Sequence, residues 1–335
     1  MSSRIVRLAA GAAAVAIFAA AAPPQRGTQP PRRKAAVKKA PEPPPLPCGD
    51  YVSFQVLLDR QGFSSGEIDG RPGTNFSRAL AALQNARHLA ATSQPDCETW
   101  HALGGDHAEP TIAPYTITDD DLKGPFAPDI PRELAKQASL DALGYRSPLE
   151  MIAERFHASP ALLKQLNEGA SFAAGHELRV PGVAAPFVGD AKPATDPLAD
   201  GATIQVTRAE SAVRATRADG TIVFFAPVTT GSEHDPLPIG DWKVTGVQWH
   251  PVFHYNPNLF WDAKPQDARA DIKPGPNNPV GVVWIALTRE HYGLHGTPEP
   301  GNIGHTESHG CVRLTNWDAA HLAAIVKPGT PVLFR

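Results

Sequence analysis

Two proline-rich segments divide this chain into candidate domains. Residues 23–47 combine proline with alanine and basic residues, and residues 183–200 combine proline with alanine and aspartate. Such segments cannot bury enough apolar surface to fold, so they behave as extended linkers. The sequence of 335 residues therefore predicts a multidomain chain, with ordered domains over residues 48–105, 114–182 and 201–335.

Residues 1–22 have the pattern of a secretory signal peptide. Arg4 and Arg7 precede an alanine-rich apolar run that extends from Leu8 to Ala22. The run is shorter than the roughly 20 apolar residues that cross a bilayer. We expect export to the periplasm or cell wall, with no stable membrane insertion after signal cleavage. An uncleaved N-terminal anchor is the alternative, and the sequence does not fix the cleavage site.

The distribution of charge argues against nucleic acid as a partner. Residues 1–47 contain eight of the 31 basic residues and one of the 34 acidic residues. The remainder therefore has 23 basic and 33 acidic side chains, a net charge of about −10. A domain with this excess of negative charge would repel a phosphate backbone.

The chain has three cysteines, which fall into two groups. Cys48 and Cys97 flank the first ordered domain, and in an oxidising compartment they are candidates for a disulfide. Closing a loop of about 50 residues would stabilise that domain by roughly 3–4 kcal/mol. Cys311 is left over, which makes it the candidate for a reactive thiol.

Residues 48–105 are predicted to form a small helical domain. Phe54, Leu57 and Leu58 have helical spacing within a helix over Tyr51–Gln61, and a second helix follows from about Asn75, with Thr74 as its N-cap. The strings that resemble the peptidoglycan-binding type of helical domain are Leu57–Phe63, Ile68–Gly70 and Ala79–Gln84.

Residues 114–182 are predicted to form an α+β domain. Ser147 to Glu150 make a capping box with proline at the first helical position, and Ser159-Pro160 opens a second helix. A strand over Glu177–Val180 follows. This order resembles the LysM glycan-binding module, except that a long insertion separates the candidate first strand, Tyr115–Thr118, from the helices. A spacer domain without glycan affinity is the alternative.

Residues 201–335 are predicted to be mainly β. Alternating apolar residues and Gly/Pro punctuation indicate a mostly antiparallel, two-sheet architecture. One helix is expected over Trp317–Val326, with Asn316 as its cap. The expected strands are Thr203–Arg208, Thr221–Thr230, Trp242–Trp249, Val280–Thr288 and Pro331–Phe334.

A histidine and a cysteine motif near the C-terminus carry the predicted chemistry. The chain reads His295-Gly296-Thr297 and later Ser308-His309-Gly310-Cys311-Val312-Arg313-Leu314. Adjacent strands would bring His295 within reach of Cys311, so that the imidazole could activate the thiol as a nucleophile. A glycine before the nucleophile lets backbone amides approach a developing oxyanion.

The same region resembles the YkuD-type L,D-transpeptidase catalytic domain, which is a mainly-β fold. The matching strings are Pro238–Gly240, Pro274–Gly281, Tyr292–Thr297, Ile303–Gly304, Ser308–Leu314, Asn316, Asp318 and Gly329–Val332. The resemblance implies that Cys311 is the nucleophile and that His295 is the general base.

The resemblance also implies supporting roles for neighbouring residues. The Gly296 carbonyl would orient the imidazole, and the amides from Gly310 to Cys311 would hold the oxyanion. Arg313 would bind a substrate carboxylate, with a structural salt bridge as the alternative. Ser308 and His309 would assist catalysis or stabilise the turn.

By this resemblance, Cys311 forms a thioester with a peptidoglycan tetrapeptide stem and releases D-alanine. The acyl group then passes to an amine, which crosslinks or remodels the wall without any cofactor. The partner would be peptidoglycan, through its peptide stems and possible glycan contacts. An L,D-carboxypeptidase that uses water, or a non-catalytic wall-binding protein, is the alternative. The sequence decides neither the acceptor, nor the oligomeric state, nor whether the N-terminal domains bind glycan or inhibit the site.

A zinc site was weighed from two His-x3-His spacings, His291/His295 and His305/His309. Such a spacing suits zinc when both histidines lie on one helix. The first pair falls in a β-like segment and the second in a glycine-containing loop. We therefore predict no metal.

Overall fold

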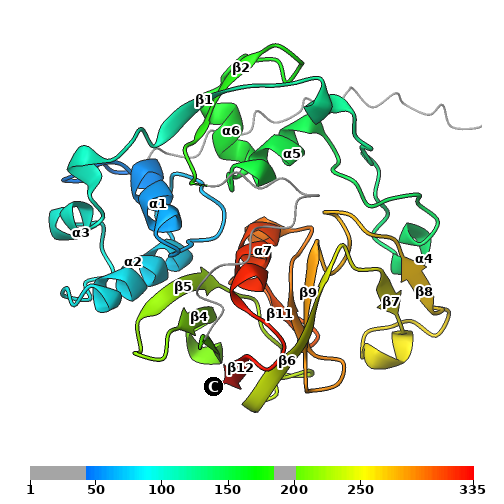
Figure 1. Cartoon of the computed structure of the whole chain (residues 1–335). Coiled ribbons are helices and arrows are strands. Elements are labelled where there is room, and N and C mark those ends of the chain that lie inside the picture. Colours follow the sequence, from blue (N-terminus) through cyan, green and yellow to red (C-terminus); the bar gives the residue numbers. More distant parts are fainter. Residues whose placement is uncertain (1–42, 185–200) are drawn as a thin grey trace, which may run out of the picture. The chain divides into compact units, whose positions relative to one another are not determined.

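The computed structural model describes residues 43–184 and 201–335, and Figure 1 labels their elements. The predicted signal peptide and most of both predicted linkers fall on residues 1–42 and 185–200, which lie outside the described residues. Among the described helices, none is long and apolar enough to cross a membrane.

The first segment is helical, as predicted. It consists of α1 (Tyr51–Arg60), α2 (Thr74–Ala86) and α3 (Cys97–Ala102). Phe54, Leu58 and Leu80 are completely buried in its core. The predicted cap of α2 is wrong, because Gly73 occupies the N-cap position and Thr74 is the first helical residue. Glycine is tolerated at this position, although it supplies no side-chain acceptor.

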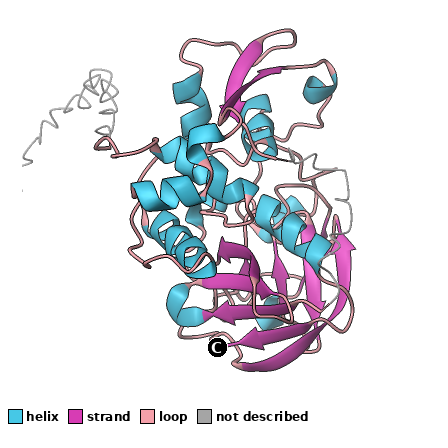
Figure 2. Ribbon diagram, turned by 60° about the vertical axis from the view of Figure 1, so that its left-hand side comes forward, coloured by secondary structure: helices cyan, strands magenta, loops and turns pink. Residues whose placement is uncertain are grey.

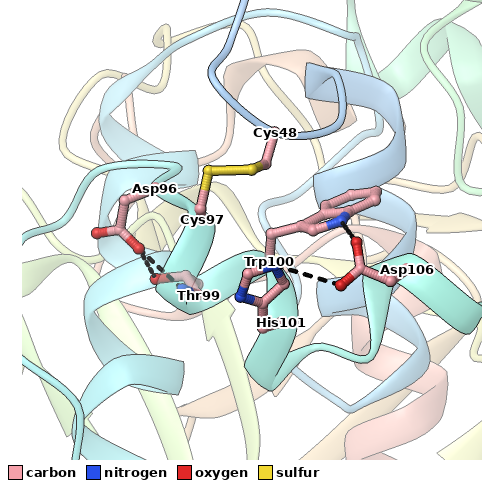
Figure 3. Close-up of a disulfide and its surroundings, with 7 residues drawn as sticks. All are labelled: Cys48, Asp96, Cys97, Thr99, Trp100, His101 and Asp106. Atoms are coloured by element: carbon pink, nitrogen blue, oxygen red, sulfur yellow. Dashed lines mark hydrogen bonds and ion pairs between the residues drawn. A yellow bond between two sulfur atoms is a disulfide. The ribbon is translucent and has the colours of Figure 1, made fainter.

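The predicted disulfide between Cys48 and Cys97 is present, with an S–S distance of 2.00 Å. It fastens the start of α3 to the chain that precedes α1, as Figure 3 shows. Beside it, the Trp100 indole N–H donates a hydrogen bond to Asp106 at 3.0 Å, and the Trp100 ring packs on Phe54 with 5.1 Å between ring centroids. The disulfide and this tryptophan together hold α3 against α1.

The second segment has three helices between two strands, one helix more than expected from the sequence. Its elements are β1 (Ile112–Thr116), α4 (Leu134–Gln137), α5 (Pro148–Arg155), α6 (Pro160–Leu166) and β2 (Glu177–Pro181). The side chains of Ser147 and Ser159 cap α5 and α6, as predicted. β1 pairs antiparallel with β2, although it begins and ends before the predicted Tyr115–Thr118. The long insertion between β1 and α5 contains α4.

The third segment is built around one eight-stranded sheet in the order β11-β10-β9-β6-β12-β3-β4-β5. Figure 2 shows its strands curling around one another. A small hairpin pairs β7 with β8 outside this sheet. The strands are β3 (Thr203–Thr207), β4 (Ala212–Thr216), β5 (Ile222–Pro227), β6 (Gly240–Trp249), β7 (Phe253–Tyr255), β8 (Ala270–Ile272), β9 (Val283–Leu287), β10 (Gly293–His295), β11 (Val312–Arg313) and β12 (Pro331–Phe334).

The two predicted sheets are joined through β6, which the sequence did not reveal. The first residues of this long strand, from Gly240 to Lys243, pair with β12, and the rest pairs with β9. A bulge between Val244 and Gly246 marks the change of partner. Bulges bend a strand and increase its twist, so a single sheet can curl where two sheets were expected.

The first segment covers the exposed edge of the sheet at β5. The Phe225 amide donates to the Gly62 carbonyl at 2.8 Å, and the Ser64 amide donates to the Phe225 carbonyl at 2.8 Å. A Cβ atom on Gly62, where φ is +81°, would lie 2.6 Å from the Val223 carbonyl oxygen. The close approach therefore requires glycine, and the pairing blunts an edge that could otherwise bind another chain.

Helix α7 (Asn316–Ile325) packs against β9 and β10 of the sheet and against α5 of the second segment. Most of its residues are buried, which is why its sequence is apolar nearly all round. The predicted cap, Asn316, is wrong by one position. The side chain of Thr315 accepts the Asp318 amide hydrogen bond instead, and Asn316 is the first helical residue.

His157 joins all three segments from the turn between α5 and α6. Its Nδ1 atom lies 2.9 Å from an Asp59 carboxylate oxygen of α1, and its Nε2 atom lies 3.8 Å from an Asp318 oxygen of α7. Its ring stacks on Trp317 with 5.0 Å between centroids. Burial alone lowers the pKa of His157, but the charges of Asp318 and Asp59 outweigh burial and leave the pKa above its usual value.

We expect His157→Phe to destabilise the protein by about 3–5 kcal/mol, because two buried carboxylates lose their common partner. The phenyl ring retains the contact with Trp317, so the change mainly removes the charge. The measurement is the free energy of unfolding in urea at pH 6. The raised pKa means that the stabilisation is fully present below the unfolded histidine pKa of about 6.5 and is lost as the pH rises through the folded value.

The matched control is His254→Ala, which breaks the exposed His254–Asp271 pair with 74% of each side chain accessible. An exposed pair contributes less than about 1 kcal/mol. Equal losses in the two variants would contradict the role assigned to His157.

Candidate active site

Two short parallel strands at one end of the sheet assemble the candidate site. β10 pairs with β11 so that Leu294 lies opposite Val312 and His295 lies opposite Arg313. Residues opposite each other in neighbouring strands project to the same face, as do residues two apart along a strand. His295 and Arg313 therefore lie on one face of this strand pair, and Cys311 immediately precedes β11.

The His295 imidazole is buried, with 3% of the residue exposed, and it is held in one orientation. Its Nδ1 atom lies 2.7 Å from the Gly296 carbonyl oxygen, and its ring stacks on Trp284 with 5.4 Å between centroids. A carbonyl can only accept a hydrogen bond, so Nδ1 carries the proton and Nε2 keeps a lone pair. This is the tautomer that a general base needs.

The electrostatics keep His295 neutral. Burial lowers the pKa of the imidazole to about 3, with the positive charge of Arg313 acting in the same direction and the hydrogen bond to Gly296 opposing it. At neutral pH the ring is therefore uncharged and able to accept a proton. The causes of this lowered pKa include no neighbouring carboxylate, which is the group that would stabilise an imidazolium.

Cys311 supplies a half-buried thiol beside the first residues of β10. Its Sγ atom lies 3.6 Å from the His291 carbonyl oxygen, toward which the thiol can donate. Burial raises the pKa of the thiol, while the Gly293 amide and the charge of Arg313 partly offset that rise. The resting site thus holds a neutral thiol and a neutral imidazole, because burial disfavours both charged forms.

The turn before Cys311 is fixed by Ser308 and requires glycine at position 310. The Ser308 hydroxyl donates to the Cys311 carbonyl at 2.6 Å and accepts from the Gly310 amide at 3.2 Å. Gly310 has φ = +100°, and a Cβ atom there would lie 2.7 Å from the Tyr292 ring. The Gly310 amide, which the sequence analysis assigned to the oxyanion, is bonded to Ser308 in this state.

The His309 side chain contacts the connection between β7 and β8. Its Nε2 atom lies 2.9 Å from an Asp262 carboxylate oxygen, and its ring packs against Phe260 with 5.0 Å between centroids. Asp262 and Phe260 belong to the connection between β7 and β8. That connection also presents Trp261, which is 58% exposed. The geometry gives His309 a role in holding this hairpin beside the Cys311 turn.

No sequence pattern connects Asp262 to the site. It lies 47 residues from His309, and neither residue stands in a regular pattern that would relate the two. The fold packs the β7–β8 connection against the turn before Cys311, and this packing places Phe260 and Asp262 near the site.

The Arg313 guanidinium remains without a salt-bridge partner among the described residues. Burial lowers the pKa of Arg313, while the charges of Cys311 and Glu299 raise it. The structural salt bridge that was the alternative to substrate binding is therefore not found within residues 43–184 and 201–335. A half-buried cation beside the thiol suits an anionic group on a ligand.

The two histidine pairs that were weighed for zinc do not lie on helices. His291 is in a left-handed turn with φ = +66°, near Glu290, and His305 is in the loop after Asn302. Within the described part of the chain, no group of three or more His, Cys, Asp or Glu side chains has the geometry to hold a metal ion.

Comparison with known proteins finds similarity in the third segment. Residues 201–333 match the family model of the YkuD L,D-transpeptidase catalytic domain. "Putative L,D-transpeptidase YkuD" of Bacillus licheniformis is 47% identical over 60 residues, which are 18% of this chain and 36% of that protein. "Probable L,D-transpeptidase YbiS" of Escherichia coli K12 is 33% identical over 118 residues, which are 33% of this chain and 37% of that protein.

The matches support a YkuD-type L,D-transpeptidase catalytic domain in this chain, within which both His295 and Cys311 lie. The chain spans little more than a third of the length of either relative. The resemblances of residues 48–105 to a peptidoglycan-binding domain and of residues 114–182 to LysM stay predictions.

We expect the alkylation of Cys311 by iodoacetamide to rise about tenfold per pH unit from pH 6 toward pH 9, because only the thiolate reacts and burial raises the thiol pKa. Arg313→Gln should slow the reaction at each pH, since Arg313 lowers that pKa. Mass spectrometry measures the rate. Cys311→Ala is the control, because the other two cysteines are joined in a disulfide. A plateau near pH 6–7 would instead indicate a resting thiolate paired with imidazolium.

Proposed function

We propose that this protein is an exported L,D-transpeptidase that acts on peptidoglycan peptide stems. The observation that carries the proposal is the pairing of β10, which holds His295 as its Nδ1–H tautomer, with β11, which Cys311 immediately precedes, inside the YkuD match. The disulfide between Cys48 and Cys97 supports export, because such bonds persist in oxidising compartments.

In the first half of the reaction, Cys311 attacks the carbonyl that precedes the terminal D-alanine of a tetrapeptide stem. His295 Nε2 takes the thiol proton as the C–S bond forms, and backbone amides at the cysteine turn stabilise the oxyanion. The C–N bond to D-alanine then breaks, and the imidazolium returns the proton to the departing amine. The product of this half is a thioester on Cys311.

In the second half, an amine of another stem or of a protein attacks the thioester. His295 accepts a proton from that amine, a new amide forms, and the sulfur leaves and recovers its proton from the imidazolium. No cofactor enters either half. Water in place of the amine would make the enzyme an L,D-carboxypeptidase, so the product defines the acceptor.

Arg313 links substrate binding to the reactivity of this neutral pair. Its charge lowers the pKa of His295, so a substrate carboxylate that binds Arg313 would offset this charge and strengthen the imidazole as a base. The same carboxylate would also raise the pKa of the Cys311 thiol, because Arg313 lowers it. Transfer of the thiol proton to His295 would therefore accompany attack on the bound stem.

The test is incubation of the purified protein with a disaccharide-tetrapeptide, followed by mass spectrometry of the products. We expect a crosslinked dimer that has lost one D-alanine. Cys311→Ala should abolish the product, and His295→Gln should reduce the rate by about 10²–10⁴, the usual contribution of a general base.

The alternatives predict different products. Tripeptide alone would show an L,D-carboxypeptidase. Binding of peptidoglycan without any Cys311-dependent product would show a non-catalytic wall-binding protein. Full transpeptidation by Cys311→Ala would contradict the assigned nucleophile.

A further inference from the structure

The Asn316 side chain lies directly behind the carbonyl that orients His295. Asn316 is 1% exposed, and its Oδ1 atom accepts the Val282 amide hydrogen bond at 3.1 Å. A Cβ atom on Gly296 would lie 2.1 Å from this Oδ1 atom, so the amide packs closely on the Gly296 backbone. Since the Gly296 carbonyl holds His295 Nδ1 at 2.7 Å, the position of Asn316 bears on the position of the imidazole.

The other end of the Asn316 amide is held from outside the catalytic domain. Its Nδ2 atom donates to the two carboxylate oxygens of Glu154 at 3.2 and 3.0 Å, and to the Pro276 carbonyl at 3.0 Å. Glu154 belongs to α5, in the second segment. The hydroxyl of Tyr145, from the same segment, donates to Glu154 at 3.0 Å.

The Glu154 carboxyl group fixes which way round the Asn316 amide lies. In the reversed orientation, Oδ1 would face the oxygens of Glu154 and Pro276, and Nδ2 would face the Val282 amide. The hydrogen bonds at both ends of the Asn316 amide would then be lost in a buried site, at a cost of about 1–3 kcal/mol for each unsatisfied group. An apolar residue at position 154 would leave only the Pro276 and Val282 contacts to set the orientation.

Burial of the Glu154 carboxyl group is unfavourable, so its hydrogen bonds from Asn316 and Tyr145 are needed to offset that cost. Burial raises the pKa of its carboxyl group to about 7, although the hydrogen bonds from Asn316 and Tyr145 lower it. No arginine or lysine forms a salt bridge with Glu154 among the described residues. The hydrogen-bond donors that contact the Glu154 carboxyl group are the neutral side chains of Asn316 and Tyr145.

We propose that Glu154 is a positioning residue for His295, acting through Asn316 and the Gly296 carbonyl. The proposal rests on the assignment of His295 as the general base under the proposed function. The second segment, residues 114–182, thereby completes the active site of the catalytic domain in addition to any role as a binding domain or spacer.

Glu150 provides a matched control on the same helix. Its carboxylate accepts a hydrogen bond from Asn277 of the catalytic domain at 3.0 Å, with no contact to Asn316 or His295 among the described residues. Glu150→Ala therefore removes a contact of the same kind between the same two segments, together with the bonds of Glu150 to the Arg146 amide and guanidinium. Any effect of Glu154→Ala that exceeds that of Glu150→Ala reports on the path through Asn316.

The experiment uses the full chain and two independent measurements. The first is kcat and KM for stem transpeptidation. We expect Glu154→Ala to lower kcat by about tenfold to hundredfold with KM changed less than about twofold, since a displaced catalytic group affects the reaction step more than binding. Glu154→Gln should recover part of the loss, because one acceptor oxygen remains. Asn316→Ala should behave like Glu154→Ala, and the double variant should lose no more than either single variant.

The second measurement is the NMR signal of the His295 Nδ1 proton, which does not depend on turnover. This proton is hydrogen-bonded to Gly296 and protected by burial, and we expect its signal to shift or broaden in Glu154→Ala and Glu154→Gln but not in Glu150→Ala. An unchanged signal together with an unchanged kcat would overturn the proposal, as would losses equal to those of Glu150→Ala. If the wild-type protein lacks transpeptidase activity, the proposed function fails, and the NMR signal alone decides whether Glu154 positions His295.

Discussion

The first turn of α7 buries polar groups that take some of their partners from the second segment. Asp318 and Asn316 are almost completely inaccessible, and their partners include His157 and Glu154 of the second segment. A buried polar group without a partner costs more than its hydrogen bond contributes when made. The packing of α5 on α7 is therefore a condition for the native arrangement around the β10–β11 pair.

Burial also sets the resting chemistry of the site. The same low-dielectric environment raises the pKa of Cys311 and lowers that of His295, so neither group is charged before a substrate arrives. Arg313 is the nearby cation whose effect a bound anion could cancel. A neutral pair of this kind differs from a cysteine site that stores a thiolate.

Local sequence signals predicted much of this fold. Ser147 and Ser159 mark the starts of their helices because a cap needs only its own first turn, and the apolar pattern of Pro331–Phe334 matches β12 residue for residue. The alanines and arginine of β4 have a weak strand preference, so that strand was missed. The joining of two expected sheets through β6 was also missed, since the choice of pairing partner depends on residues far along the chain.

The sequence by itself predicted His295 and Cys311 as the candidate pair and Cys48 and Cys97 as the disulfide partners, because these predictions depend on residue type and on the small number of cysteines. The tertiary structure alone decided the tautomer of His295, the direction of His309 toward Asp262 and the bond between Glu154 and Asn316. The last two residues lie 162 positions apart. A contact over that distance forms only when the whole fold brings α5 against α7, since the lost entropy of so long a loop must be offset by many other contacts.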